Sequence, residues 1–225
     1  MIYKNVSREK SIQDQIVHNF HRLFYNTAAF KGTWKDMEWL GVKLLKNPFD
    51  LWIFQEIIFD VKPDIIIESG TKFGGSALYL ASICDLIGKG RILSIDVEDY
   101  KNKPVHGRIK YLLGSSVSEE ILLQVKSEIS SNDKVLVILD SDHRELHVLT
   151  ELRSYSPLVS KDSYIIVEDT HLNGHPIDPL FGPGPMEAVI EFLKGNQDFI
   201  IDKSKEKLYM TWNPNGYLKK IKSSE

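Results

Sequence analysis

Short apolar runs alternate with helical patterns along the chain from Asp64 onward. Four of these runs are continuously apolar rather than alternating, which is typical of strands buried on both faces of a parallel sheet. The pattern predicts seven strands: Asp64–Ser69, Arg91–Asp96, Ile109–Gly114, Lys134–Asp140, Ser163–Asp169, Asp198–Asp202 and Lys207–Trp212.

Apolar residues with helical spacing lie between these runs. They predict helices over Gly75–Ile87, Arg144–Tyr155 and Met186–Lys194. Only a few polar residues separate the last two predicted strands, too few for a helical crossover, so these strands are expected to pair as an antiparallel hairpin. The fold class is therefore α/β, with a Rossmann-like, mostly parallel sheet that ends in an antiparallel strand.

The first 60 residues have a different pattern and are expected to form an N-terminal helical and aromatic arm, followed by one α/β domain over residues 61–225. Met1–Tyr25 resembles an amphipathic helix, and Trp34, Trp39 and Trp52 follow it among polar residues. Such aromatic residues either form a subunit interface or cover the core of the sheet. The first interpretation favours a homo-oligomer.

Composition limits the class of protein. A chain of 225 residues that is 42% hydrophobic can bury the core of one large α/β domain. The net charge of −3 gives no reason to expect a nucleic-acid partner. The single cysteine, Cys84, favours a reducing compartment, and no segment has the apolar length of a membrane span or signal peptide. A cytoplasmic protein is expected.

A glycine-rich turn, ESGTKFGGS, follows the first predicted strand of the domain, where an open α/β sheet collects its ligands. Its spacing matches neither the dinucleotide fingerprint nor the phosphate-binding P-loop. It resembles the first motif of S-adenosylmethionine-dependent methyltransferases. Asp96, at the end of the next strand, is suited to the ribose hydroxyls. The candidate cofactor-binding residues are Glu68, Gly70, Thr71, Gly74, Gly75, Ser76, Asp96, Ser115, Ser116 and Asp140.

Carboxylates end the next two strands of the predicted sheet. Asp140 and Asp142 follow one strand, and Glu168 and Asp169 end the neighbouring one. Adjacent parallel strands lie about 5 Å apart, so these acids are expected to converge. Crowded carboxylates repel one another unless a cation lies between them, and oxygen ligands suit Mg²⁺ or another hard divalent ion. All four are candidate metal ligands.

These motifs together resemble the cephalosporin hydroxylase family and its sugar O-methyltransferase relatives. The resemblance rests on ESGTKFGGSA, LDSDH, VEDT, NGHP and GPGPMEAVIEFL, and it extends from about Trp34 to the C-terminus. It implies the fold of class I methyltransferases, with S-adenosylmethionine and Mg²⁺ as cofactors. It also implies that Glu168, Asp169 and one aspartate of LDSDH bind the metal. The sequence leaves open whether that aspartate is Asp140 or Asp142.

Methyl transfer to a hydroxyl needs a base close to the acceptor oxygen. His143 stands where catechol-type enzymes have a lysine base, and His171 and His175 are the other candidates. The expected function is metal-dependent O-methylation of a sugar or other small metabolite. Two alternatives remain: a metal-dependent hydroxylase, which usually needs two histidines and one carboxylate on the metal, and a non-catalytic accessory protein that only binds the cofactor.

Overall fold

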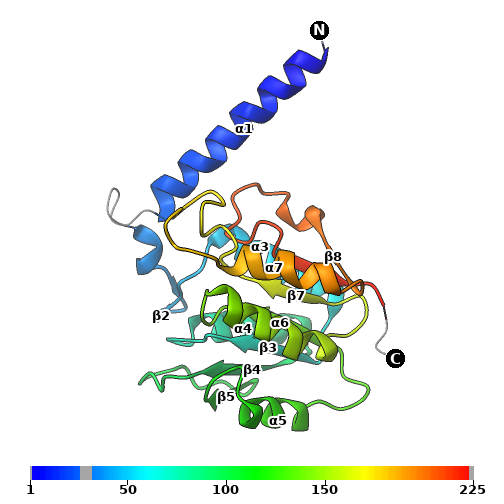
Figure 1. Cartoon of the computed structure of the whole chain (residues 1–225). Coiled ribbons are helices and arrows are strands. Elements are labelled where there is room, and N and C mark those ends of the chain that lie inside the picture. The colour runs from blue at the N-terminus through cyan, green and yellow to red at the C-terminus, as the bar shows by residue number, and fades with distance from the viewer. Residues whose placement is uncertain (1, 26–31, 223–225) are drawn as a thin grey trace.

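A seven-stranded sheet forms the centre of the computed structural model, which describes residues 2–25 and 32–222 (Figure 1). The strand order is β5-β4-β3-β6-β7-β9-β8, and β9 is antiparallel to both of its neighbours. The strands are β3 (Ile65–Ser69), β4 (Arg91–Asp96), β5 (Ile109–Leu113), β6 (Val135–Leu139), β7 (Tyr164–Val167), β8 (Phe199–Ile201) and β9 (Tyr217–Lys220).

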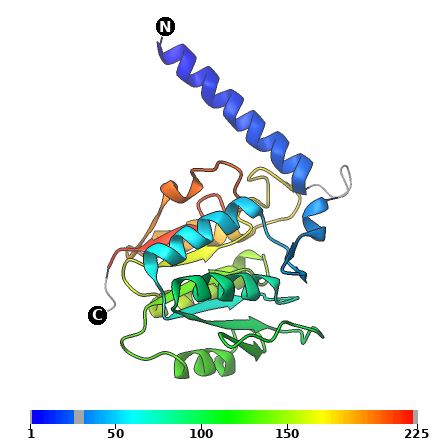
Figure 2. The ribbon, with the colours of Figure 1, turned by 180° about the vertical axis from the view of Figure 1, so that it is seen from behind.

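Helices cover both faces of this sheet. On one face lie α5 (Glu119–Ser127), α6 (Glu145–Tyr155) and α7 (Pro185–Gly195), and on the other lie α3 (Pro48–Val61) and α4 (Gly75–Ile87), as Figures 1 and 2 show from opposite sides. Every residue of β3, β6 and β7 is buried, because helices pack on both sides of these strands. The expected mixed sheet and the three predicted helices are thus confirmed, whereas α3 and α5 were not predicted.

The register of the parallel strands determines where the polar residues meet. Ser69 of β3 pairs with Leu139 of β6, and Leu139 pairs with Val167 of β7. The residues that follow these three positions therefore emerge side by side at the carboxyl edge of the sheet. The glycine-rich turn and both acidic motifs lie at this edge.

The predicted strand Lys207–Trp212 is wrong, because the last strand is β9, at Tyr217–Lys220. Residues 207–212 instead cross over α3, where their backbone groups bond to side chains. The Met210 carbonyl accepts from Asn47, and the Trp212 N–H donates to Asp50 over 2.8 Å. A backbone group used in this way is not available to a neighbouring strand.

The N-terminal helix α1 (Ile2–Tyr25) projects away from the sheet, and its C-terminal half lies next to the rest of the protein (Figures 1 and 2). Residues 32–46 follow as η1 (Thr33–Asp36) and a small hairpin of β1 (Glu38–Trp39) and β2 (Val42–Lys43). In the part of the chain that is described, no helix is both long and apolar enough to cross a membrane.

The three tryptophans of the expected arm have three different environments. Trp39 packs edge-on against Tyr79 of α4, so it covers the core. Trp52 is 61% exposed on α3, and Trp34 lines the main cavity of the protein. The expected homo-oligomer stays a prediction.

Candidate active site

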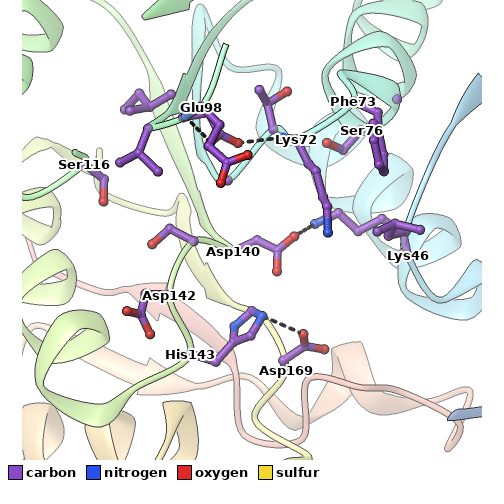
Figure 3. Close-up of a pocket in the computed structure, with 18 of the residues that line it drawn as sticks. Lys46, Lys72, Phe73, Ser76, Glu98, Ser116, Asp140, Asp142, His143 and Asp169 are labelled. Atoms are coloured by element: carbon purple, nitrogen blue, oxygen red, sulfur yellow. Dashed lines mark hydrogen bonds and ion pairs between the residues drawn. The ribbon is translucent and has the colours of Figure 1, made fainter. Parts of the chain in front are cut away.

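A cavity of about 450 Å³ opens at the carboxyl edge of the sheet (Figure 3). It extends from the glycine-rich turn after β3, past the end of β4, to the acidic motifs after β6 and β7. A volume of this size is ordinary for a small-molecule site, and the carboxyl edge is where α/β sheets bind their ligands. The sequence motifs therefore meet in one cavity.

The glycine-rich turn is held against two neighbouring strands. Gly70 has φ +85°, and a Cβ there would lie 1.8 Å from the carbonyl oxygen of Asp140. Across the turn, Asp96 accepts from the backbone N–H of Lys72 over 2.7 Å and from that of Glu98 over 2.9 Å. These bonds fix the Asp96 carboxylate at the cavity wall, in the place that suits a ribose.

Most of the predicted cofactor residues line this cavity, namely Gly70, Thr71, Gly75, Ser76, Asp96, Ser115, Ser116 and Asp140. Glu68 instead lies fully buried beneath the turn, where it accepts from Ser94 over 2.7 Å. Gly74 is the N-cap residue of α4 and does not line the cavity. The fold requires glycine at position 75 with or without a cofactor, because a Cβ there would lie 2.2 Å from the carbonyl oxygen of Lys43.

Asp140, His143 and Asp169 converge at the centre of the cavity. Each offers one ligand atom, and these atoms all lie within 4.8 Å of one another. The Nε2 atom of His143 is 3.2 Å from Asp169 Oδ2 (Figure 3). Asp169 has φ +56°, a backbone conformation that is uncommon outside glycine and concentrates at functional sites. Its N–H donates to the Asn213 side chain over 3.0 Å, which helps to hold it there.

Lys46 is a site residue that the sequence did not reveal. It is 4% exposed, and its ammonium pairs with Asp140 and with Glu168, whose Oε1 is 2.5 Å away. Burial lowers its pKa, but Asp140 and Glu168 outweigh burial and raise it above the ordinary value, so Lys46 stays charged. Because 94 and 122 residues separate it from its partners, no local pattern could indicate this pairing.

The two remaining predicted metal ligands lie apart from this centre. Asp142 is exposed at the cavity rim, where its Oδ1 accepts from the Arg144 N–H over 3.0 Å. Glu168 is buried against Lys46, behind the cavity lining. Of the two aspartates that the sequence left open, Asp140 is the one that belongs to the cluster with His143 and Asp169.

The three candidate bases lie in three different environments. His143 lines the cavity. His171 is fully buried, and its Nδ1 bonds to the Trp212 carbonyl over 2.9 Å. Burial lowers its pKa well below the ordinary value. His175 bonds to Glu187 of α7 over 2.9 Å, which ties its loop to that helix. His143 is thus the best placed of the three.

The acidic residues fit a divalent cation. Burial raises the pKa of Asp169 to about 6, and burial together with Asp140 raises that of Glu168 well above its ordinary value. Lys46 offsets only part of this negative charge. A hard divalent ion would relieve the rest, and carboxylate oxygens are the ligands it prefers. Asp140 and Asp169 are the residues placed to hold it, with His143 beside them.

Comparison with known proteins identifies the family. Residues 31–221 match the family model described as Rhamnosyl O-methyltransferase/CmcI. The chain is 35% identical over 213 residues to the rhamnosyl O-methyltransferase of Mycobacterium leprae, and the aligned region covers 91% of this chain and 90% of that protein. The Mycobacterium tuberculosis protein of the same name is 35% identical over 214 residues, or 91% and 85% of the two chains.

The chain belongs to the rhamnosyl O-methyltransferase/CmcI family. This confirms the family resemblance that the sequence motifs indicated. Solved structures of CmcI share the fold: one described as an apo-structure has a TM-score of 0.66 at 18% identity, and one described with Mg and S-adenosylmethionine has 0.62 at 17%. Both cover 84% of this chain and 78% of the CmcI chain.

Proposed function

We propose that this protein is an S-adenosylmethionine-dependent, divalent-metal-dependent O-methyltransferase that acts on a hydroxyl of a sugar, with a rhamnosyl group as the leading candidate. The observation that carries the proposal is the meeting of Asp140, His143 and Asp169 in one cavity with the glycine-rich turn and Asp96. The family and the names of its mycobacterial members support the reaction and the sugar acceptor.

The cofactor half of the cavity is suited to a nucleoside sulfonium. Asp96 is oriented to accept hydrogen bonds from ribose hydroxyls, and Ser115 and Ser116 lie farther along the same wall. Gly70 allows the turn to lie directly against the backbone of Asp140, because a side chain at this position would collide with that backbone. These residues would hold the cofactor in the same cavity as the acidic centre, where its methyl group could meet the acceptor.

Residues of this protein would accept the hydroxyl proton and stabilise the charge that results. The acceptor oxygen attacks the methyl carbon, the carbon–sulfur bond breaks with its electron pair on sulfur, and the hydroxyl proton passes to the His143 imidazole. Asp169, 3.2 Å from His143 Nε2, orients the ring and stabilises the imidazolium. Asp140 and Asp169 would hold Mg²⁺, which when bound supplies positive charge that lowers the pKa of the acceptor hydroxyl.

The two alternatives are less well supported. A hydroxylase iron site usually needs two histidines and one carboxylate, whereas among the described residues the acidic cluster contains one histidine, His143. His171 and His175 are bonded to Trp212 and Glu187. An accessory protein would not need a base paired with a carboxylate beside the cofactor turn.

A methyl-transfer assay tests the proposal. Wild-type protein with S-adenosylmethionine, Mg²⁺ and methyl α-L-rhamnopyranoside should form S-adenosylhomocysteine and a methylated sugar, and EDTA should stop the reaction. His143→Ala should reduce kcat by roughly 10²–10⁴-fold, the usual contribution of a general base. Asp140→Asn should weaken Mg²⁺ binding in calorimetry more than Asp142→Asn does. A protein that fails to bind S-adenosylmethionine would overturn the proposal.

A further inference from the structure

Three aromatic side chains line the same cavity as the acidic centre: Tyr25, Trp34 and Trp212, here called the aromatic wall. The rings of Tyr25 and Trp34 are stacked, with centroids 5.3 Å apart and planes 7° from parallel. Trp212 stands nearly perpendicular to both, at 5.2 Å and 5.3 Å. None of the motifs that carry the proposed methyl transfer accounts for this wall.

Hydrogen bonds from two parts of the chain hold the wall in place. Trp34 Nε1 donates to the Tyr25 carbonyl over 3.2 Å, which joins η1 to the end of α1. Trp212 is 4% exposed, and its backbone is bonded to Asp50 on one side and to His171 on the other. Its indole Nε1 has no hydrogen-bond partner in the described part of the chain. A buried N–H of this kind is costly unless a ligand or water satisfies it.

The electrostatics connect the wall to the acidic centre. Burial raises the pKa of the Tyr25 phenol above its ordinary value, and the negative charges of Asp169, Asp178 and Asp140 raise it further. The geometry gives the same connection: the Tyr25 ring packs edge-on against His171, with centroids 4.8 Å apart, and His171 Nδ1 lies 3.8 Å from Asp169 Oδ1. A protonated phenol can donate a hydrogen bond to an acceptor oxygen at the metal side of the cavity.

A pyranose ring has an apolar face of C–H groups and a rim of hydroxyls. Aromatic rings suit the first, and carboxylates with a bound cation suit the second. We propose that the aromatic wall is the acceptor subsite, which receives the apolar face of a 6-deoxyhexose while one of its hydroxyls points toward Asp169 and His143. This inference rests on the proposed function and names the residues that select its substrate.

The N-terminal segment then belongs to the active site. Tyr25 is the last residue of α1, and Trp34 lies in η1, both ahead of the first strand of the main sheet. Acceptor selection therefore depends in part on residues that precede the sheet in sequence.

Steady-state kinetics with methyl α-L-rhamnopyranoside test the subsite. Trp34→Ala should raise the KM for the rhamnoside about tenfold, the equivalent of one aromatic contact, while its Kd for S-adenosylmethionine stays unchanged. Trp34→Phe should restore much of the loss. Trp52→Ala, a substitution of an exposed tryptophan on α3, is the matched control and should behave as wild type.

A second comparison uses methyl α-L-mannopyranoside, which differs from the rhamnoside only by a hydroxyl on C6. Wild-type protein should prefer the rhamnoside, and Trp34→Ala should reduce that preference. Equal KM values for Trp34→Ala and Trp52→Ala, with an unchanged preference, would overturn the subsite.

Saturation-transfer NMR with the rhamnoside separates this inference from the proposed function. Binding without any methyl transfer, lost in Trp34→Ala, would retain the aromatic wall as a sugar subsite and reject the proposed reaction. Transfer that proceeds with unchanged rhamnoside binding in Trp34→Ala would retain the reaction and reject the wall. No binding of the rhamnoside to wild-type protein would reject the wall as a deoxyhexose site.

Discussion

Lys46 provides the sharpest test of how the acidic centre is held together. Lys46→Met keeps a side chain of similar length and removes the charge that pairs with Asp140 and Glu168. The Lys46 ammonium is 2.5 Å from Glu168 Oε1, and at an effective dielectric of about 20 one such pair contributes about 6–7 kcal/mol of Coulomb attraction. Desolvation of the buried charges offsets much of this attraction, at several kcal/mol per ion.

The net cost follows from what the substitution leaves behind. Removing one partner of a buried ion pair typically costs about 3–5 kcal/mol, because the remaining charge is buried without compensation. Total stability of a domain is about 5–15 kcal/mol, so Lys46→Met should lose a large part of it. For a chain of this size, roughly 2–4 °C per kcal/mol gives a fall in Tm of roughly 6–20 °C.

Thermal unfolding followed by circular dichroism measures this loss, with Lys207→Met as the control. Lys207 also forms a 2.5 Å ion pair, with Glu56, but it is 51% exposed, and exposed pairs contribute about 0–1 kcal/mol. Mg²⁺ should raise the Tm of Lys46→Met more than that of wild type, because it replaces part of the missing positive charge. Equal losses for the two substitutions, or no difference in the effect of Mg²⁺, would refute this reasoning.

Two further predictions concern the turn and the acidic pair. Gly70→Ala should abolish S-adenosylmethionine binding in calorimetry, because its Cβ would lie 1.8 Å from the Asp140 carbonyl oxygen. Gly88 is the control, because it has a similar positive φ of +72° but open space around it. Gly88→Ala should cost only about 1 kcal/mol of stability and leave binding intact. Burial raises the pKa of Asp169 to about 6, above its ordinary 3.8, so the metal-free protein should lose stability as pH rises from about 4 to about 6 and level off above that, while Mg²⁺ affinity increases up to the same pH. Asp169→Asn should flatten both pH profiles, and an unchanged profile in that variant would assign the titration to another group.

The sequence predicts correctly those strands that are buried on both faces of the sheet. Strands β3, β6 and β7 are buried on both faces, so their sequences are continuous apolar runs, and the predicted positions are confirmed. Strand β9 was not found because its sequence, YLKK, contains two lysines. Lys220 is nevertheless 2% exposed, since its ammonium donates to the carbonyls of Ser156 and Val159 over 3.2 and 2.8 Å. Long-range hydrogen bonds of this kind leave no trace in hydrophobic periodicity.

The sequence predicts the positions of those site residues that directly follow a strand. The positions of Asp140 and Asp169 follow from the register of β6 and β7, and their role as metal ligands stays a prediction. Glu168 instead pairs behind the cavity lining with Lys46, which lies ahead of the sheet in sequence and reaches it only through tertiary packing. The aromatic wall likewise joins Tyr25 to Trp212 across most of the chain.

The position of β9 between β7 and β8 has a consequence for synthesis on the ribosome. Strand β7 is complete at Val167, but its free edge finds no partner until residues 217–220 have emerged, about 50 residues later, at roughly 5–20 residues per second. Strand β8, although it is made first, has no place in the sheet until β9 has docked. During this interval a nascent chain exposes an unpaired apolar edge, the kind of surface on which chaperones act and from which aggregation begins.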